Sequence, residues 1–194
     1  MCDGLPGAGF VPGPATRRAG APVLFLDRDG VINVNLGYVH TVERTQWVDG
    51  LPALLRQSQV KGYDIVIATN QAGIARGYYS TEAFEAYTGW VHARLAEAGG
   101  AVLGTYFCPH HPTAGLGTLR TDCTCRKPAP GMFLAAMGRF GIDPATAVLV
   151  GDKTTDMLAG AAAGIRRRIL VGQEPEGEPG ADVLRRDNPG DVTL

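Results

Sequence analysis

The sequence predicts an α/β fold in which a doubly wound parallel sheet carries helices on both of its faces. Short, continuously apolar runs alternate along the chain with segments whose apolar residues recur at helical spacing. That alternation is typical of βαβ units. The apolar runs also lack the in–out pattern of a strand with one wet face, so we expect them to be buried on both sides.

Five apolar runs are expected to be strands, and each stops at a polar residue or a glycine. They are residues 23–26, 64–68, 102–107, 147–150 and 169–171. In open parallel sheets, ligands bind outside the carboxyl ends of the strands. Asp27, Thr69, Cys108 and Asp152 all stand at such ends. The sequence therefore places the functional site at this edge of a Rossmann-like sheet.

Two helices are expected in the first half of the chain. Residues 51–60 have a helical pattern, with Pro52 in the first turn, where proline is tolerated. Residues 81–98 follow Ser80, a plausible N-cap. This second segment carries apolar side chains at helical spacing, namely Phe84, Tyr87, Val91 and Leu95.

Two more helices are expected in the second half. Residues 131–140 place Phe133, Leu134, Met137 and Phe140 near one face. Residues 156–163 should be helical and stop at Gly164.

The composition limits the classes of protein that need to be considered. The chain has 194 residues, is 45% hydrophobic and 19% charged, and carries a net charge of −1. These values fit one soluble domain with no broad attraction to nucleic acid or anionic membrane. No apolar run is long enough to span a bilayer, and the N-terminus lacks the layout of a secretory signal. We therefore expect a cytoplasmic protein, and the absence of a self-association stripe favours a monomer.

The ends of the chain differ in composition from its centre. Residues 1–20 are rich in Gly, Pro and Ala without periodicity, and we expect a flexible arm. From about residue 174 the chain turns again to Gly, Pro and charge. The expected domain is therefore residues 21–173, followed by a C-terminal tail over 174–194.

The stretch Phe25–Asn33, FLDRDGVIN, places two aspartates at the end of a buried strand. An Asp-x-Asp pair alone is weak evidence, because it is common in solvated turns. Three polar elements follow in order at later positions, however: Thr69, Lys127, and the GDKTTD stretch with Asp152 and Asp156. Such a set suits phosphoryl transfer, which needs an attacking carboxylate, Mg²⁺ held by oxygens, a cation on the phosphoryl group and an acid–base group.

These four ordered motifs, spread over residues 22–171, resemble those of the haloacid dehalogenase (HAD) superfamily. The resemblance implies a phosphoaspartyl intermediate on Asp27 and a general acid/base at Asp29. It also implies Mg²⁺ bound by Asp27, Asp152 and the backbone carbonyl of Asp29, with Thr69 and Lys127 acting on the phosphoryl group. Members with the second aspartate are usually phosphatases. Asp156 is expected to support the residues of the site without contacting the substrate. No insertion indicates a large cap domain.

A cysteine–histidine cluster lies between Cys108 and Pro128. Cys108, His110, Cys123 and Cys125 offer four ligands of the kind that bind Zn²⁺ tetrahedrally, in a Cys-x-His and a Cys-x-Cys pair. A reduced cluster without metal is the alternative, but the stretch is polar and loop-like. His111 is a rival for His110. A zinc ion here would be structural and would stiffen the loop that carries Arg126 and Lys127.

A zinc loop of this layout resembles two groups of bacterial phosphatases within the superfamily. One group hydrolyses the C7 phosphate of D-glycero-D-manno-heptose 1,7-bisphosphate, and the other hydrolyses histidinol phosphate. The stretches NLGYVH, TNQAGIARG and CRKPAPGM, and the long His110–Cys123 spacing, favour the heptose group. That resemblance implies substrate contacts from Asn35, Leu36, Gly37, Tyr38, Asn70, Gln71, Ala72, Arg126 and Lys153.

The leading hypothesis is thus a Mg²⁺-dependent sugar bisphosphate phosphatase with a small-molecule partner. Histidinol-phosphate phosphatase keeps the chemistry and changes the substrate. A non-catalytic, zinc-stabilised binding domain is the alternative from a different class.

Overall fold

A computed structural model describes residues 7–172 and 182–194. Its sheet has the strand order β1-β4-β3-β2-β5-β6-β7, and all neighbours are parallel except β1 and β4. The strands are β1 Gly9–Pro12, β2 Val23–Leu26, β3 Asp64–Asn70, β4 Val102–Cys108, β5 Val148–Gly151, β6 Arg167–Val171 and β7 Val183–Arg186. The predicted doubly wound parallel sheet is therefore confirmed.

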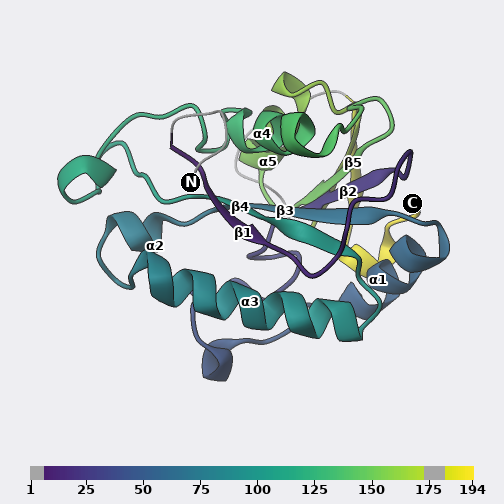
Figure 1. Ribbon diagram of the computed structural model, residues 1–194, viewed down its shortest axis with the longest axis horizontal. Helices are drawn as coiled ribbons and strands as arrows, with labels where there is room; N and C mark the ends of the chain where they lie inside the picture. The colour runs from purple at the N-terminus through teal and green to yellow at the C-terminus, as the bar shows by residue number, and fades with distance from the viewer. Residues whose placement is uncertain (1–6, 173–181) are drawn as a thin grey trace.

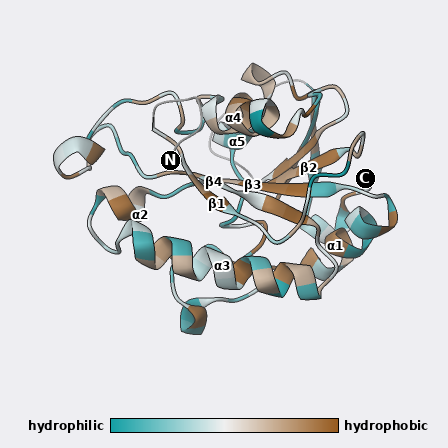
Figure 2. Ribbon diagram, in the orientation of Figure 1, coloured by the Kyte–Doolittle hydropathy of each residue, from teal (hydrophilic) through white to brown (hydrophobic). Residues whose placement is uncertain are grey.

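Helices cover both faces of this sheet (Figure 1). They are α1 Leu51–Val60, α2 Ala72–Ala75, α3 Thr81–Glu97, α4 Gly131–Phe140 and α5 Thr154–Ala162. Short 3-10 turns form at η1 Val42–Arg44, η2 Gly117–Leu119 and η3 Pro189–Asp191. Helices α1 and α3 lie on one side, and α4 and α5 lie on the other. Two apolar cores result, one on each face, and the central strands between them are strongly apolar (Figure 2).

The local signals for α3 are confirmed in detail. The Ser80 hydroxyl accepts a hydrogen bond from the backbone N–H of Ala83 at 3.2 Å, which satisfies a donor of the first turn. The four apolar side chains of the predicted face, Phe84, Tyr87, Val91 and Leu95, are all buried. The helix thus packs the face that its sequence spacing indicates.

The predicted face of α4 is partly wrong. Leu134 is exposed, whereas Met132, Phe133 and Ala136 are buried. Successive helical residues are turned by about 100°, so Leu134 lies nearly opposite Met132. Because α4 presents the Met132 side to the sheet, Leu134 faces solvent.

The sheet extends beyond both expected domain boundaries. Residues 9–12, expected to be part of a flexible arm, form β1 along the edge of β4. Arg17 and Arg18, which belong to the same expected arm, each donate to the buried Asp64 carboxylate at 2.7 Å. Residues 183–186, expected to lie in the C-terminal tail, form β7 beside β6. Both are four-residue edge strands with no clear apolar alternation, so the sequence gives them no signal. Residues 1–6 of the arm and 173–181 around the tail boundary lie outside the described residues.

A buried histidine on α3 makes stability depend on pH. The His92 ring is 2% exposed, and its Nε2 lies 2.7 Å from the Thr105 hydroxyl. Burial lowers the pKa of His92 to about 4. The unfolded chain binds this proton more readily, so folding stability is complete above pH 6.5 and falls as the pH drops toward 4. We expect His92 to account for a loss of about 2–3 kcal/mol across that window.

Urea unfolding of the wild type and His92→Gln at pH 7.0, 5.5 and 4.5 checks this. The difference in unfolding free energy between the two proteins should shift in favour of the variant as the pH falls. Parallel curves for the two proteins would rule the effect out.

Among the described helices, none is long and apolar enough to cross a membrane.

Candidate active site

The carboxyl ends of β2, β3 and β5 surround a small polar pocket of about 40 Å³. The side chains that line it come from four separate segments of the sequence. They are Asp27, Asp29, Thr69, Asn70, Lys127, Lys153, Thr155 and Asp156. All but Thr155 were singled out from the sequence. Thr155 lies inside the GDKTTD stretch but carries no signal that separates it from its neighbours.

Lys127 is the buried cation of this pocket, with 4% exposure. Its Nζ donates to Asp27 Oδ1 at 2.8 Å and to the carbonyl of Ala68 at 2.8 Å, and lies 2.6 Å from Asp156 Oδ1. Burial by itself would lower the pKa of Lys127, but Asp156 and Asp27 outweigh it and raise the pKa. The lysine is therefore a fixed positive charge beside Asp27.

The backbone of Lys127 is held as firmly as its side chain. Asn70 Oδ1 accepts from the Lys127 N–H, and Asn70 Nδ2 donates to the Lys127 carbonyl, each at 3.0 Å. Asn70 was expected to contact substrate. In the structure its amide joins the end of β3 to the loop that carries the lysine.

The pKa values of Asp27 and Asp152 are shifted in opposite directions. Burial opposes ionisation of Asp27, yet Lys127 and Lys153 hold its pKa below the ordinary value. Burial and the charge of Asp27 raise the pKa of Asp152 to about 8. Asp152 Oδ1 is buried without a hydrogen-bond partner in the described chain, and Lys153 Nζ lies 3.5 Å away.

This donor set fits a divalent cation. Carboxylate oxygens of Asp27, Asp152 and Asp156 lie within 4.8 Å of one another, and oxygen ligands are those that Mg²⁺ prefers. Asp156 is already engaged, because its Oδ1 pairs with Lys127 and its Oδ2 accepts from the Lys153 N–H at 3.0 Å. Asp27 and Asp152 are therefore the carboxylates with capacity left for a metal.

Asp29 is surrounded by hydrogen-bond donors. Arg28 Nη2 donates to both of its carboxylate oxygens, at 2.9 and 2.8 Å. Asn33 Nδ2 donates to Oδ1 at 2.9 Å, and Gln71 Nε2 approaches Oδ2 at 3.3 Å. Gln71 is itself oriented by the Tyr79 hydroxyl, which donates to its Oε1 at 2.7 Å. Sequence reasoning missed Arg28 and Tyr79, because a charge between two aspartates and a tyrosine eight residues past Gln71 carry no distinct pattern.

The expected substrate loop does not line the small pocket itself. Asn35, Leu36, Gly37 and Tyr38 are exposed, and Tyr38 has a left-handed backbone φ of 51°. The Tyr38 ring meets Tyr78 edge to face, with centroids 4.7 Å apart. Ala72 begins α2, and Arg126 Nη1 donates to the carbonyl of His110 at 3.2 Å. None of these contacts tests a substrate role, which stays a prediction.

The four expected zinc ligands converge. Cys108 Sγ lies 3.6 Å from Cys123 Sγ, and Cys123 Sγ lies 3.3 Å from Cys125 Sγ. His110 Nδ1 lies 3.8 Å from the Cys108 sulfur and 3.5 Å from that of Cys125. A tetrahedral zinc with its usual bond to sulfur separates neighbouring ligand atoms by roughly 3.8 Å. The distances between the ligand atoms therefore suit zinc.

The three cysteine thiols of the cluster affect one another's ionisation. A hydrogen bond from Cys125 is the main cause that lowers the pKa of Cys108 to about 6. The hydrogen bond to Cys108 and burial raise the pKa of Cys125. Burial raises the pKa of Cys123. The three thiols therefore do not ionise together without a compensating charge. His111, the rival ligand, uses its Nδ1 to accept from the backbone of Ala114 at 3.0 Å.

Comparison with known proteins decides the family. A family model described as "HAD-hyrolase-like" matches residues 124–186. The D-glycero-beta-D-manno-heptose-1,7-bisphosphate 7-phosphatase of Pasteurella multocida is 49% identical over 148 residues, or 76% of this chain and 80% of the relative. The enzyme of the same name from Haemophilus ducreyi is 45% identical over 170 residues, or 85% of this chain and 93% of the relative. The chain belongs to this phosphatase family of the HAD-like hydrolases.

Solved structures agree with this assignment to the HAD-like phosphatases. A HAD-like phosphatase from Mesorhizobium loti is 37% identical with a TM-score of 0.81, covering 93% of this chain and 88% of that one. The D,D-heptose 1,7-bisphosphate phosphatase of B. bronchiseptica was solved with magnesium and phosphate and is 31% identical, with a TM-score of 0.72. The match covers 87% of this chain and 94% of that one. The predicted superfamily, fold class and phosphatase class are thus confirmed, and an enzyme is shown rather than a binding domain.

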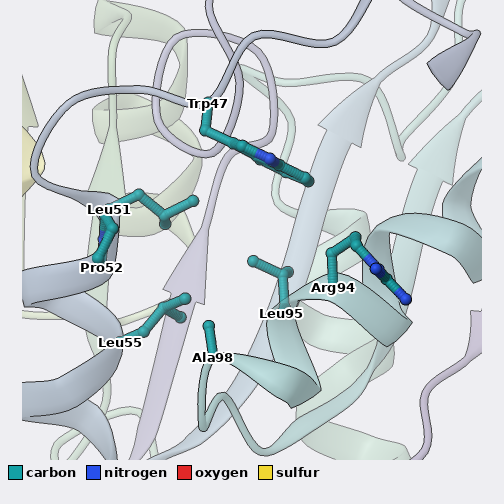
Figure 3. A pocket seen from close by; sticks show the side chains of 7 residues that line it. All are labelled: Trp47, Leu51, Pro52, Leu55, Arg94, Leu95 and Ala98. Carbon is teal, nitrogen blue, oxygen red and sulfur yellow. The ribbon is translucent and has the colours of Figure 1, made fainter. Parts of the chain in front are cut away.

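A second cavity on this phosphatase is larger but has a different character. It holds about 200 Å³ between α1 and α3 and is mostly apolar (Figure 3). Its lining consists of Trp47, Leu51, Pro52, Leu55, Arg94, Leu95 and Ala98. It contains no carboxylate, so phosphatase chemistry belongs to the smaller polar pocket.

Gly30 provides a sharp test of the candidate metal site. Its φ is +95°, and a Cβ there would lie 2.1 Å from Asp152 Oδ2. Gly30→Ala should therefore displace Asp152 and weaken the apparent Mg²⁺ affinity by about tenfold or more. The measurement is the Mg²⁺ concentration that gives half-maximal activity.

Gly138→Ala on α4 is the matched control for Gly30→Ala, because a Cβ there meets open space. An unchanged Mg²⁺ requirement in Gly30→Ala would contradict the assignment of Asp152.

Proposed function

We propose that this phosphatase hydrolyses the C7 phosphate of D-glycero-β-D-manno-heptose 1,7-bisphosphate, with Mg²⁺ as cofactor. The observation that carries the proposal is the buried Lys127–Asp27 pair beside an Asp152 oxygen that accepts no hydrogen bond from the described chain. This arrangement places an ionised carboxylate (Asp27), a fixed cation (Lys127) and an available metal ligand (Asp152) close together. The names of the well-covered relatives supply the sugar and its β anomer.

Asp27 is the proposed nucleophile. Its carboxylate attacks the C7 phosphorus, the bond from phosphorus to the sugar oxygen breaks, and a phosphoaspartate forms. Asp29 gives its proton to the leaving oxygen. Asp29 then takes a proton from a water molecule, which attacks phosphorus and releases inorganic phosphate and free Asp27. Bound at Asp27, Asp152 and the Asp29 carbonyl, Mg²⁺ would supply positive charge against the phosphoryl oxygens.

Thr69 and the basic residues complete the proposed site. The Thr69 hydroxyl accepts from Gln71 Nε2 at 2.8 Å, which leaves its own proton free for a phosphoryl oxygen. Lys127 stabilises the transferred group as a fixed charge. Lys153, whose pKa is raised by Asp27 and Asp152 against the effect of burial, and Arg126 are proposed to recognise the anionic substrate.

The test measures phosphate release with Mg²⁺ from the α and β anomers of heptose 1,7-bisphosphate and from histidinol phosphate. The proposal expects kcat/KM to be highest for the β-heptose. A preference for histidinol phosphate would overturn the substrate and keep the chemistry. Release from none of the three would overturn both.

Zinc at Cys108, His110, Cys123 and Cys125 is the second proposed metal, with a structural role next to Lys127. We expect one zinc per purified chain by elemental analysis and a loss of that zinc in Cys123→Ser. The variant should also melt at a lower temperature, because zinc binding contributes folding free energy. A zinc-free wild type of full stability would contradict this role.

The expected cytoplasmic location and monomeric state stay predictions, which cell fractionation and gel filtration would check.

A further inference from the structure

Arg28 is the more deeply buried of the two buried arginines in the described chain, and the proposed reaction gives it no role. It is 1% exposed. Burial of an arginine is costly unless its charge is paired and its donors are bonded. Its burial between two active-site aspartates therefore indicates a role for its charge.

The contacts of Arg28 converge on Asp29. Its Nη2 donates to both Asp29 oxygens, and its Nε lies 3.3 Å from Oδ1. The same Nη2 donates to the carbonyl of Val39 at 2.7 Å. The rings of Phe84 and Tyr87 lie 5.5 Å each from the guanidinium carbon. The guanidinium is thus held by two rings of α3 and by the Val39 carbonyl, and within the described chain Asp29 is its only carboxylate partner.

The two oxygens of Asp29 are not equivalent in this arrangement. Oδ1 accepts from Arg28 Nη2, Arg28 Nε and Asn33 Nδ2. Oδ2 accepts from Arg28 Nη2, and its second donor, Gln71, is longer at 3.3 Å. Gln71 also contacts Thr69, which lines the pocket. Through Gln71, Oδ2 is therefore the oxygen linked to the pocket-lining Thr69, and it accepts fewer hydrogen bonds than Oδ1.

We propose that Arg28 is a positioning residue that holds both oxygens of Asp29 and thereby keeps Oδ2 directed to the transferred phosphoryl group. The inference rests on the proposed function, which gives Asp29 its proton-transfer role. Arg28 itself touches neither substrate nor metal in this account. Without Arg28, Asp29 can turn away, and both proton transfers slow while attack by Asp27 remains possible.

This predicts different losses for two kinds of substrate. p-Nitrophenyl phosphate has a leaving group that needs no proton, so phosphorylation of Asp27 needs no help from Asp29. Hydrolysis of the phosphoaspartate still needs Asp29 as a base for any substrate. The heptose bisphosphate needs Asp29 in both steps, because its leaving group is an alkoxide.

The experiment is stopped-flow release of nitrophenolate by the full chain with Mg²⁺, for the wild type and Arg28→Met. The variant should show a burst close to one nitrophenolate per chain, with a burst rate within a few-fold of wild type. Its steady rate should be about 10²-fold lower, as should its first turnover on heptose bisphosphate. If Arg28→Met does not fold, the same two rates are measured for Arg28→Lys. We then expect the same separation of burst and steady rates, with a smaller loss of the steady rate.

Arg168→Met is the matched control. Arg168 is also a buried arginine, but its Nη1 donates to the carbonyl of Ile165, away from the pocket. It should change stability without separating the burst and steady rates. If Arg28→Met lowers both rates by the same factor, or neither, Arg28 is only a packing residue and the proposal fails. Failure of the proposed substrate would appear separately, as a wild type that turns over the aryl phosphate and not the heptose.

Discussion

Asp27→Asn is expected to lower kcat by at least about 10⁴-fold while fold and zinc content stay unchanged. A carboxamide cannot form the phosphoaspartate, and it cannot form the ion pair with Lys127. The change should not unfold the protein, because it also removes a negative charge that raises the pKa of Asp152. Phosphate release, far-UV circular dichroism and zinc analysis together give the measurement.

Asp49→Asn serves as the control for Asp27→Asn, because Asp49 is an exposed aspartate outside the pocket. Residual turnover by Asp27→Asn above about a tenth of the wild-type rate would exclude Asp27 as the nucleophile.

Lys127→Met is expected to have the second-largest effect, lowering kcat/KM by about 10³-fold. The variant removes the fixed cation from the phosphoryl site. It also leaves Asp27 and Asp156 as buried carboxylates without their partner, a change that typically costs 3–5 kcal/mol, so we expect a loss of about that size. Because a divalent cation would offset part of this charge, Mg²⁺ should restore more stability to the variant than it adds to the wild type.

Thermal melts with and without Mg²⁺, together with steady-state kinetics, measure both effects of Lys127→Met. Lys61→Met replaces an exposed lysine and should leave kcat/KM and the Mg²⁺ effect unchanged. A Lys127→Met variant with wild-type activity would mean that the buried charge serves packing alone.

The central strands and helices could be predicted because their signals are local. Residues 23–26 are an uninterrupted apolar run, and Ser80 precedes a helical pattern, so each segment indicates its own structure. The edge strands could not be predicted in this way. β1 is stabilised by pairing with β4, about a hundred residues away, rather than by a pattern within its four residues, and Arg17 and Arg18 in the segment after it pair with Asp64.

The same distinction holds in the site. Asp27, Thr69 and Lys127 follow strand ends or a recognisable motif, and the structure brings all three to one pocket. The support around Asp29 depends on segments that meet only in three dimensions, such as the Phe84 and Tyr87 rings on α3. A sequence pattern does not show that an arginine between two aspartates is buried rather than solvated.

Rapid acid quench of the wild type mixed with β-heptose 1,7-bisphosphate and Mg²⁺ tests directly whether Asp27 is phosphorylated during turnover. We expect a phosphorylated chain within the first turnover, and peptide mapping should place the phosphoryl group on Asp27. The phosphorylated chain should decay as inorganic phosphate from C7 appears. Phosphate release without any phosphorylated chain, or a phosphoryl group on another residue, would mean that Asp27 is not the nucleophile.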